Sequence, residues 1–351
     1  MWPIDLEGFE PIRQLGSGGF GKVWLAEQTD LDRQVAVKIG HNPLLTLDGQ
    51  RRFDRERRAL GRLSGHRHIV GIHTAGISND LPYIVMAYID NGTLTDRGQE
   101  FSESELRLLT DQLADAIGAA HEIGIIHRDL KPENVFIDRD GSAVLGDFGT
   151  ARLADWSTTA SRQIVASMAF VAPEILEGEQ PTIRTDIYGI GITIIAAILG
   201  RSPFVNDDPS TPAGLAMQVM KGNAMAVPPG RISPEFEALL LQCMHLDPQQ
   251  RPSGASMLRH QLAKLPPPIE NTVDSDAQNA TTVIEMVPQD DAAKKHQTIP
   301  PSWKRYQLKV PLTKRPLQYK LRRRPKLRLE SLQPPRNNEV ACRCWSVSQL
   351  F

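Results

Sequence analysis

The chain has few cysteines, no long apolar run and no signal-like start, and each absence narrows the class of protein. Only three of its 351 residues are cysteines, Cys243, Cys342 and Cys344, and no two are separated by the two residues typical of zinc sites. This argues against a disulfide framework and favours a reducing compartment. The longest apolar stretch, residues 187–199, contains two glycines and is shorter than the roughly 18 residues that cross a bilayer, so a buried helix and no transmembrane segment are expected. The start lacks basic residues and an apolar core, so it predicts no secretory signal, and the expected location is cytoplasmic.

The formal net charge of the whole chain is only −1, but one part of the chain has no acidic residues. Residues 1–293 carry 25 Lys and Arg against 39 Asp and Glu, whereas residues 294–328 carry 13 basic residues and no acidic ones. A proline-led polar stretch, residues 266–293, separates these regions and is typical of a linker. Residues 294–351 are rich in Pro, Lys and Arg without a sustained apolar stripe, which predicts a disordered basic tail.

Before the linker, the pattern of apolar residues changes from strand-like to helical. Residues 34–39 and 81–88 are short apolar runs with β-branched side chains, which predict strands. Residues 50–63 are dense in Arg and Glu with apolar residues at helical spacing, which predicts a helix between those strands. Ser102 and Glu105 form a capping box ahead of a longer helical pattern. These elements predict an α+β fold with a small β-rich part followed by a larger α-helical part.

Four sequence motifs occur in one order along this body, and they carry the chemistry. An Asp, an Asn five residues later and a second Asp provide one base and two oxygen ligands of the kind that Mg²⁺ prefers. The glycine-rich, lysine-containing and acidic motifs that surround them complete a phosphotransfer pattern. In chain order the segments are Gly16-Ser17-Gly18-Gly19-Phe20-Gly21-Lys22-Val23, Val35-Ala36-Val37-Lys38, His127-Arg128-Asp129-Leu130-Lys131-Pro132-Glu133-Asn134 with Asp147-Phe148-Gly149, and Ala172-Pro173-Glu174.

The glycine-rich segment by itself would also suit a dinucleotide-binding fold, in which the glycines lead into a helix. Here a β-like run, residues 22–26, follows instead, so the glycines are expected to cap a hairpin whose backbone amides approach phosphate oxygens. Gly16, Gly18 and Gly21 suit this role because a Cβ would block the approach. Lys38 lies in an apolar strand, where its charge is costly unless it meets negative charge.

Together these motifs resemble the protein kinase family over residues 8–265, most closely the eukaryotic-like (Hanks-type) serine/threonine kinases of bacteria. The resemblance implies a bilobal fold, with a small β-rich N-lobe at about residues 8–88 and a larger α-helical C-lobe at about residues 89–265. It also implies ATP with Mg²⁺, or Mn²⁺ in its place, as cofactors. Proteins with Ser or Thr acceptors are the implied substrates, since Lys131 is the residue that serine/threonine kinases carry at this place.

The same resemblance implies a role for each motif residue. Asp129 would act as the catalytic base, and Lys131 would neutralise charge on the moving phosphoryl group. Lys38 would hold the α- and β-phosphates and pair with Glu56 on the following helix. The implied metal ligands are Asn134 and Asp147. The implied nucleotide contacts, with Met86 as gatekeeper, are Leu15, Gly16, Ser17, Gly18, Gly19, Phe20, Gly21, Lys22, Val23, Ala36, Lys38, Met86, Ala87, Tyr88 and Ile89.

Regulation and anchoring are also implied. Arg128 places a positive charge beside the base, and a phosphate on the loop that follows Asp147 could pair with it. The candidate sites for autophosphorylation are Ser157, Thr158, Thr159 and Ser161. The alternative is a hydroxyl-rich loop without regulation. Two further expectations are an ion pair between Arg251 and Glu174 and a central buried helix that starts at Asp186.

Two other functions stay open at this point. One is a pseudokinase scaffold, against which the presence of every motif residue argues, because a scaffold has no physical need for the whole set. The other makes the basic tail a tether for the kinase body. The tail could contact anionic lipid, nucleic acid or the acidic kinase body, since clustered Lys and Arg gain affinity from counterion release.

Overall fold

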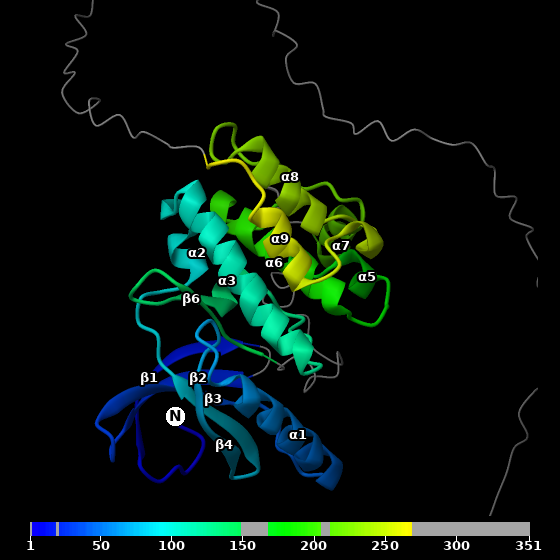
Figure 1. Ribbon diagram of the computed structural model, residues 1–351. Coiled ribbons are helices and arrows are strands. Elements are labelled where there is room, and N and C mark those ends of the chain that lie inside the picture. The colour runs from blue at the N-terminus through cyan, green and yellow to red at the C-terminus, as the bar shows by residue number, and fades with distance from the viewer. Residues whose placement is uncertain (1, 19–20, 149–167, 205–210, 269–351) are drawn as a thin grey trace, which may run out of the picture. The chain divides into compact units, whose positions relative to one another are not determined.

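A sheet of five antiparallel strands begins the fold of the computed structural model, which describes residues 2–18, 21–148, 168–204 and 211–268 (Figure 1). The strand order is β1-β2-β3-β5-β4, and each neighbouring pair is antiparallel. The strands are β1 (Phe9–Gly18), β2 (Gly21–Gln28), β3 (Arg33–Ile39), β4 (Ile72–Ser78) and β5 (Leu81–Ala87). The two strands predicted from apolar runs are therefore confirmed as β3 and β5, which lie side by side at the centre of the sheet.

One face of this sheet is covered by the first residues of the chain. Val35 and Val37 lie on one face of β3 and are fully buried, and Ala36 and Lys38 on the other face are buried as well. Ile4 packs into the same cluster. Trp2 meets Trp24 edge to face, with ring centroids 5.7 Å apart. The segment before β1 is thus part of the core of the strand-rich lobe.

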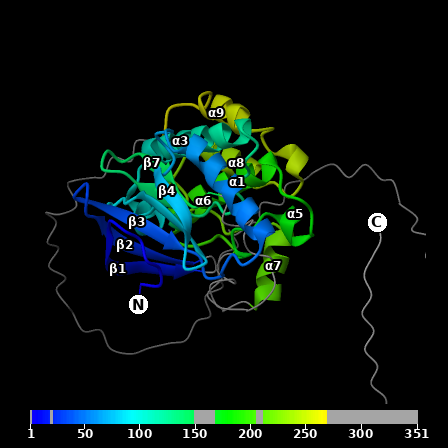
Figure 2. The same ribbon diagram turned by 90° about the horizontal axis from the view of Figure 1, so that it is seen from below.

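The predicted helix between the strands is α1 (Leu47–Leu63), and it begins earlier than the pattern of charges indicates. Thr46 caps it, because the Thr46 hydroxyl accepts a hydrogen bond of 3.1 Å from the amide of Gly49. Phe53 and Leu60 are buried on the inner side of the helix. In both views α1 lies at the edge of the strand-rich part, beside β4 (Figures 1 and 2).

Helices are the main regular elements of the described residues that follow. They are α2 (Leu94–Arg97), α3 (Glu103–Glu122), α5 (Pro173–Leu176), α6 (Ile183–Leu199), α7 (Pro212–Met220), α8 (Pro234–Cys243) and α9 (Ala255–Leu262), with 3-10 turns η1 (Gly98–Glu100), η2 (Pro132–Asn134) and η4 (Pro248–Gln250) and the small hairpin β6 (Val135–Ile137) and β7 (Ala143–Leu145). The predicted capping box begins α3, where the amide of Ser102 donates to Glu105 Oε2 at 2.7 Å. The α+β, bilobal arrangement agrees with the expected fold.

Helix α6 is the buried centre of the helical lobe. Nearly all its side chains are buried, as the apolar stretch predicts. Its two glycines allow close packing: a Cβ on Gly189 would lie 2.7 Å from the Leu130 side chain, and one on Gly191 would lie 2.8 Å from Cβ of Cys243. Gly189 therefore lets α6 approach the segment that contains the predicted base. Among the described residues, no helix has both the length and the apolar character that a bilayer crossing requires.

The expected ion pair between Arg251 and Glu174 is present and buried. The two guanidinium nitrogens Nη1 and Nη2 of Arg251 donate to the two carboxylate oxygens of Glu174, each at 2.8 Å. This pair joins α5 to the chain that precedes α9. The division into a kinase body, a linker over residues 266–293 and a tail over residues 294–351 stays a prediction, since residues 269–351 lie outside the described part.

Candidate active site

The predicted base is held in place by two neighbours in the segment that leads into β6. Lys131 Nζ donates to both carboxylate oxygens of Asp129, at 3.0 and 2.8 Å. Asn134 Nδ2 donates to Asp129 Oδ2 at 3.0 Å and to the Asp129 carbonyl at 2.7 Å. Pro132 starts the η2 turn that returns Asn134 toward Asp129. The motif thus folds on itself and fixes the direction of the Asp129 carboxylate.

The backbone before Asp129 is strained, and a buried carboxylate stabilises it. Arg128 has a φ of 71°, in the left-handed region that non-glycine residues seldom adopt. Asp186, in the first turn of α6, accepts from the amides of His127 and Arg128, each at 2.8 Å. His121 on α3 donates to the same Asp186 carboxylate at 2.8 Å. The sequence pattern indicates only a helix start at Asp186, and no motif marks His121.

The second Asp of the pattern lies next to this segment because β7 ends there. The amide of Gly146 donates to the Asn134 carbonyl at 2.8 Å, which brings the two predicted metal ligands, Asn134 and Asp147, to neighbouring positions. Asp147 also has a left-handed backbone, with a φ of 58°. His127 Nε2 donates to the Gly146 carbonyl at 2.8 Å, and its ring contacts Phe148 edge to face, with centroids 4.6 Å apart.

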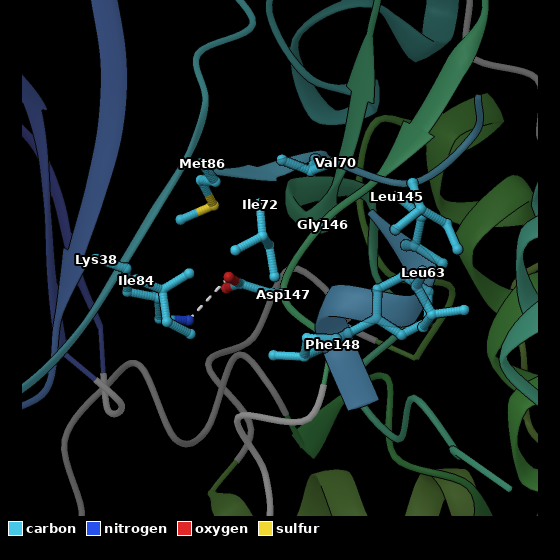
Figure 3. Close-up of a pocket in the computed structure, with 12 residues that line it drawn as sticks. Lys38, Leu63, Val70, Ile72, Ile84, Met86, Leu145, Gly146, Asp147 and Phe148 are labelled. Atoms are coloured by element: carbon cyan, nitrogen blue, oxygen red, sulfur yellow. Dashed lines mark hydrogen bonds and ion pairs between the residues drawn. The ribbon is translucent and has the colours of Figure 1, made fainter. Parts of the chain in front are cut away.

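Lys38 reaches this position from β3, 109 residues earlier in the chain. Its Nζ lies 2.8 Å from Asp147 Oδ1, and the contact is drawn in Figure 3. The Lys38 side chain is only 9% exposed, whereas that of Asp147 is 30% exposed and accessible to a ligand. Asp147 therefore supplies negative charge of the kind that the buried lysine was expected to need.

Electrostatics keep Asp147 ionised. Burial raises the pKa of the Asp147 carboxyl, but the nearby ammonium of Lys38, through its charge and hydrogen bond, and the charge of Lys131 oppose this effect, so the pKa lies below its usual value. A carboxylate in this state is a suitable oxygen ligand for a hard cation at neutral pH.

An apolar pocket adjoins the Lys38–Asp147 pair. Met86, the predicted gatekeeper, lies in its wall, and Figure 3 shows Lys38 next to Ile84 with the Asp147 carboxylate directed toward Lys38. The lining residues are Lys38, Leu60, Leu63, Ile69, Val70, Ile72, Ile84, Met86, Leu145, Gly146, Asp147 and Phe148. The pocket therefore gathers residues from α1, β3, β5 and the end of β7.

Sheet register places the other predicted nucleotide contacts nearby. Val23 pairs with Lys38 across β2 and β3, and Ala36 pairs with Met86 across β3 and β5. Leu15 to Gly18 and Gly21 to Val23 are in the two strands of the predicted hairpin, and Ala87 ends β5 just before Tyr88 and Ile89. The described residues of the hairpin and of the segment after β5 do not line the apolar pocket itself.

The glycines of the hairpin differ in the space that a Cβ atom would find at each position. A Cβ on Gly21 would lie 2.2 Å from the Ile39 carbonyl oxygen, so this glycine is required by the packing of β2 against the end of β3. A Cβ on Gly16 or Gly18 would meet nothing within 4 Å. Of the three, only Gly16 and Gly18 leave open space that a ligand could fill.

Several predicted residues lie outside the part of the chain that the structure describes. Glu56 is in α1, but its side chain is among the undescribed ones, so its predicted pairing with Lys38 stays a prediction. The same holds for the hairpin tip and the candidate phosphorylation sites, which are Gly19, Phe20, Ser157, Thr158, Thr159 and Ser161.

Comparisons with known proteins agree with this geometry. The family model described as "Protein kinase domain" matches residues 9–263. "Serine/threonine-protein kinase PknK" of Mycobacterium tuberculosis is 36% identical over 262 residues, which are 73% of this chain and 23% of that protein. "Serine/threonine-protein kinase pkn2" of Myxococcus xanthus is 35% identical over 278 residues, 74% of this chain and 33% of that protein. The chain thus spans less than half the length of either relative.

A solved structure supports the fold. The crystal structure of the Mycobacterium tuberculosis PknI kinase domain aligns with a TM-score of 0.55 and 24% sequence identity. The alignment covers 74% of this chain and 97% of that domain. At this identity the likeness concerns the fold alone.

Proposed function

The chain belongs to the protein kinase family, and from that membership we propose that it transfers the γ-phosphoryl group of ATP to serine and threonine hydroxyls of proteins. The observation that carries the proposal is the geometry around Asp129, whose carboxylate is held by Lys131 and Asn134 beside the Lys38–Asp147 pair. Relatives whose names include serine/threonine-protein kinase match the same part of the chain.

In this proposal the chain's own residues position and neutralise charge. Asp129 accepts a hydrogen bond from the substrate Ser or Thr hydroxyl. It orients the hydroxyl oxygen toward phosphorus and takes up the hydroxyl proton. Lys131, 2.8 Å from Asp129, provides positive charge where charge develops on the moving group. Lys38 holds phosphate oxygens of the nucleotide while it orients Asp147.

The two predicted metal ligands fit a magnesium ion chemically. Asn134 uses its Nδ2 to donate to Asp129, so its amide oxygen is oriented away from this contact and can bind a cation. Asp147 supplies an ionised carboxylate of which Lys38 engages Oδ1. Mg²⁺, or Mn²⁺, held by these two side chains would neutralise negative charge on the phosphates of the nucleotide.

Asp129→Asn tests the proposal, with Asp140→Asn as the matched control, because Asp140 is an exposed carboxylate after β6. Purified protein is incubated with γ-labelled ATP, Mg²⁺ and a generic protein acceptor, and the labelled residues are mapped. We expect loss of transfer by about 10²- to 10⁴-fold in Asp129→Asn, little change in Asp140→Asn, and label on Ser and Thr only. Wild-type transfer no greater than that of Asp129→Asn would favour the pseudokinase scaffold.

Regulation and the basic tail remain parts of the proposal that the same protein can test. Label within residues 157–161 of the wild type, absent in Asp129→Asn, would support autophosphorylation of the loop. Deleting residues 294–351 tests the tail: loss of binding to anionic lipid or nucleic acid with unchanged transfer would support a tether. A cytoplasmic location is proposed from the cysteine usage alone.

A further inference from the structure

The outer face of α1 carries a row of arginines that the active site does not use. Arg51, Arg55, Arg58 and Arg62 follow one another at intervals of four, three and four residues and are exposed. Because an α-helix has about 3.6 residues per turn, this spacing places them on one face. We call these four residues the arginine stripe. Leu47 continues the row at the N-terminal end of the helix.

Most of this stripe has no partner within the described part of the chain. Arg55, Arg58 and Arg62 make neither a hydrogen bond nor an ion pair with any described residue. Arg51 lies 3.9 Å from Asp48, and both side chains are largely exposed, at 74% and 82%. Such a contact contributes little. Asp48, Asp54 and three stripe arginines line one shallow hollow on this surface.

Some exposed arginines elsewhere in the described part of the chain are paired with carboxylates, although Arg13 and Arg33 are not. Arg139 donates to Asp90 at 2.9 Å, and Arg259 donates to Asp111 at 2.8 Å. The lack of an ion pair at Arg55, Arg58 and Arg62 is thus not shared by every exposed arginine of the described surface. It leaves positive charge available to a molecule outside the chain.

The sign of the charge on α1 also differs from that of the rest of the body. Residues 1–293 carry 39 acidic and 25 basic residues, but α1 alone contains six arginines against three acidic residues. Two large apolar side chains adjoin its N-terminal end, where Leu45 is 75% and Leu47 is 71% exposed. Isolated exposed leucines are ordinary, but two of them at the end of a cationic row provide an apolar contact next to a charged one.

The shape of the stripe favours a narrow anionic ligand over a broad one. Eleven residues of helix span roughly 16 Å, and the row is one side chain wide. A membrane or a nucleic acid extends well beyond a single helix, so it would also face the predominantly acidic remainder of the body, which repels it. An acidic peptide helix presents side chains three and four residues apart on one face, as the stripe does, so it can contact the stripe without facing the rest of the body.

We propose that the arginine stripe, with Leu45 and Leu47, docks an acidic helical segment of a partner protein that carries an apolar residue at one end. The buried face of α1 is not disturbed, because Phe53 and Leu60 lie on the opposite side. Docking requires no local unfolding. It is independent of phosphoryl transfer, so its failure and the failure of the kinase assignment are distinguishable.

Fluorescence anisotropy of the full chain with a labelled helix-forming peptide tests this proposal. The peptide carries Glu at the spacing of the stripe and a leucine at each end, and its matched control has Gln in place of every Glu. We expect the Glu peptide to bind, the Gln peptide to bind at least about tenfold more weakly, and binding to weaken as NaCl rises from about 50 mM to about 300 mM.

Two double variants of equal charge change locate the site. Arg55→Glu with Arg58→Glu is expected to weaken peptide binding by about tenfold or more, because two attractions become repulsions. Lys221→Glu with Lys264→Glu alters exposed residues outside α1 and is expected to change affinity by less than about twofold. Leu47→Ser should weaken binding by about fivefold.

Three results would overturn the proposal. The first is equal affinity of the wild type and the Arg55/Arg58 variant, and the second is equal loss in the Lys221/Lys264 control. In the third, phosphatidylserine vesicles or a duplex oligonucleotide bind through Arg55 and Arg58 more tightly than the peptide does, which would assign the stripe to a broad anionic surface. Thermal unfolding of each variant verifies that it is folded, as expected for changes at exposed positions.

Discussion

Replacing Arg251 with methionine removes the guanidinium from a buried ion pair with Glu174. The Arg251 side chain has no exposed surface, and the Glu174 side chain is 5% exposed. Besides the two contacts of 2.8 Å to Glu174, Arg251 donates to the carbonyls of His245 at 2.8 Å and Arg184 at 3.0 Å. Methionine keeps much of the volume but leaves the Glu174 carboxylate buried without its counter-charge. Breaking such a pair from one side lowers the free energy of unfolding by about 3–5 kcal/mol.

Urea and thermal unfolding measure this loss. At about 2–4 °C per kcal/mol for a domain of this size, Arg251→Met should unfold roughly 10 °C below the wild type. Arg251→Lys is the matched control: it keeps the charge but cannot form the bidentate contact, so we expect a smaller loss of about 2 kcal/mol. Adding Glu174→Gln to Arg251→Met should recover part of the loss, because it removes the buried unpaired charge.

The loss should depend on pH in one direction. Burial raises the pKa of the Glu174 carboxyl, but the hydrogen bonds and charge of Arg251 outweigh it and lower the pKa below its usual value. A carboxyl whose folded pKa is lowered contributes stability above its unfolded pKa of about 4.3, and this stability disappears as pH falls through the folded value. The difference between wild type and Arg251→Met should therefore be complete at neutral pH and shrink below about pH 4.

A loss below about 1 kcal/mol at pH 7 would refute the reasoning, because it is the size expected for an exposed pair. A difference that grew on acidification would contradict the assigned direction of the Glu174 pKa. An equal loss in Arg251→Lys and Arg251→Met would show that packing, and not charge, determines the effect.

Three further predictions concern other parts of the body. Burial raises the pKa of the Cys243 thiol to about 12, so maleimide mapped by mass spectrometry should label Cys243 only in urea, and rapid labelling of the folded protein would contradict its burial. Gly21→Ala should lower the free energy of unfolding by about 2 kcal/mol, because its Cβ would lie 2.2 Å from the Ile39 carbonyl oxygen. Gly18→Ala is the control and should change the free energy of unfolding by less than about 0.5 kcal/mol, because its Cβ would meet nothing within 4 Å. Equal values for the two variants in urea unfolding would contradict the packing role of Gly21. Ser102→Ala should destabilise by about 1 kcal/mol in the same assay through loss of the α3 cap, and an unchanged urea midpoint would argue against that role.

Features that depend on near neighbours could be predicted from the sequence. The hairpin of β1 and β2 follows from strand-like residues on both sides of the glycines, and the α3 cap follows from a Ser and a Glu three residues apart. The base and its two neighbours are close for the same reason, since Asp129, Lys131 and Asn134 lie within one short turn. The start of α1 was missed because the cap at Thr46 precedes the charged pattern.

Contacts between distant parts of the chain could not be predicted in the same way. The strained backbone at Arg128 depends on Asp186 of α6, and no local pattern marks that dependence. A signal was available in His121, a histidine in the last turn of α3, but its spacing alone indicates no partner. The packing reason for Gly21 could not be predicted either, because the neighbouring Ile39 carbonyl belongs to another strand.

The sequence by itself determined the family and the chemical groups of the site, because motif order and short spacings are properties of the covalent chain. It also indicated which residues form strands and helices, through the period of their apolar side chains. Only the tertiary structure decided that Lys38 meets Asp147, that Asp186 stabilises the segment before the base, and that three arginines of the stripe form no ion pair with a described residue. These facts depend on which surfaces pack together across long separations, and packing is decided by the whole fold.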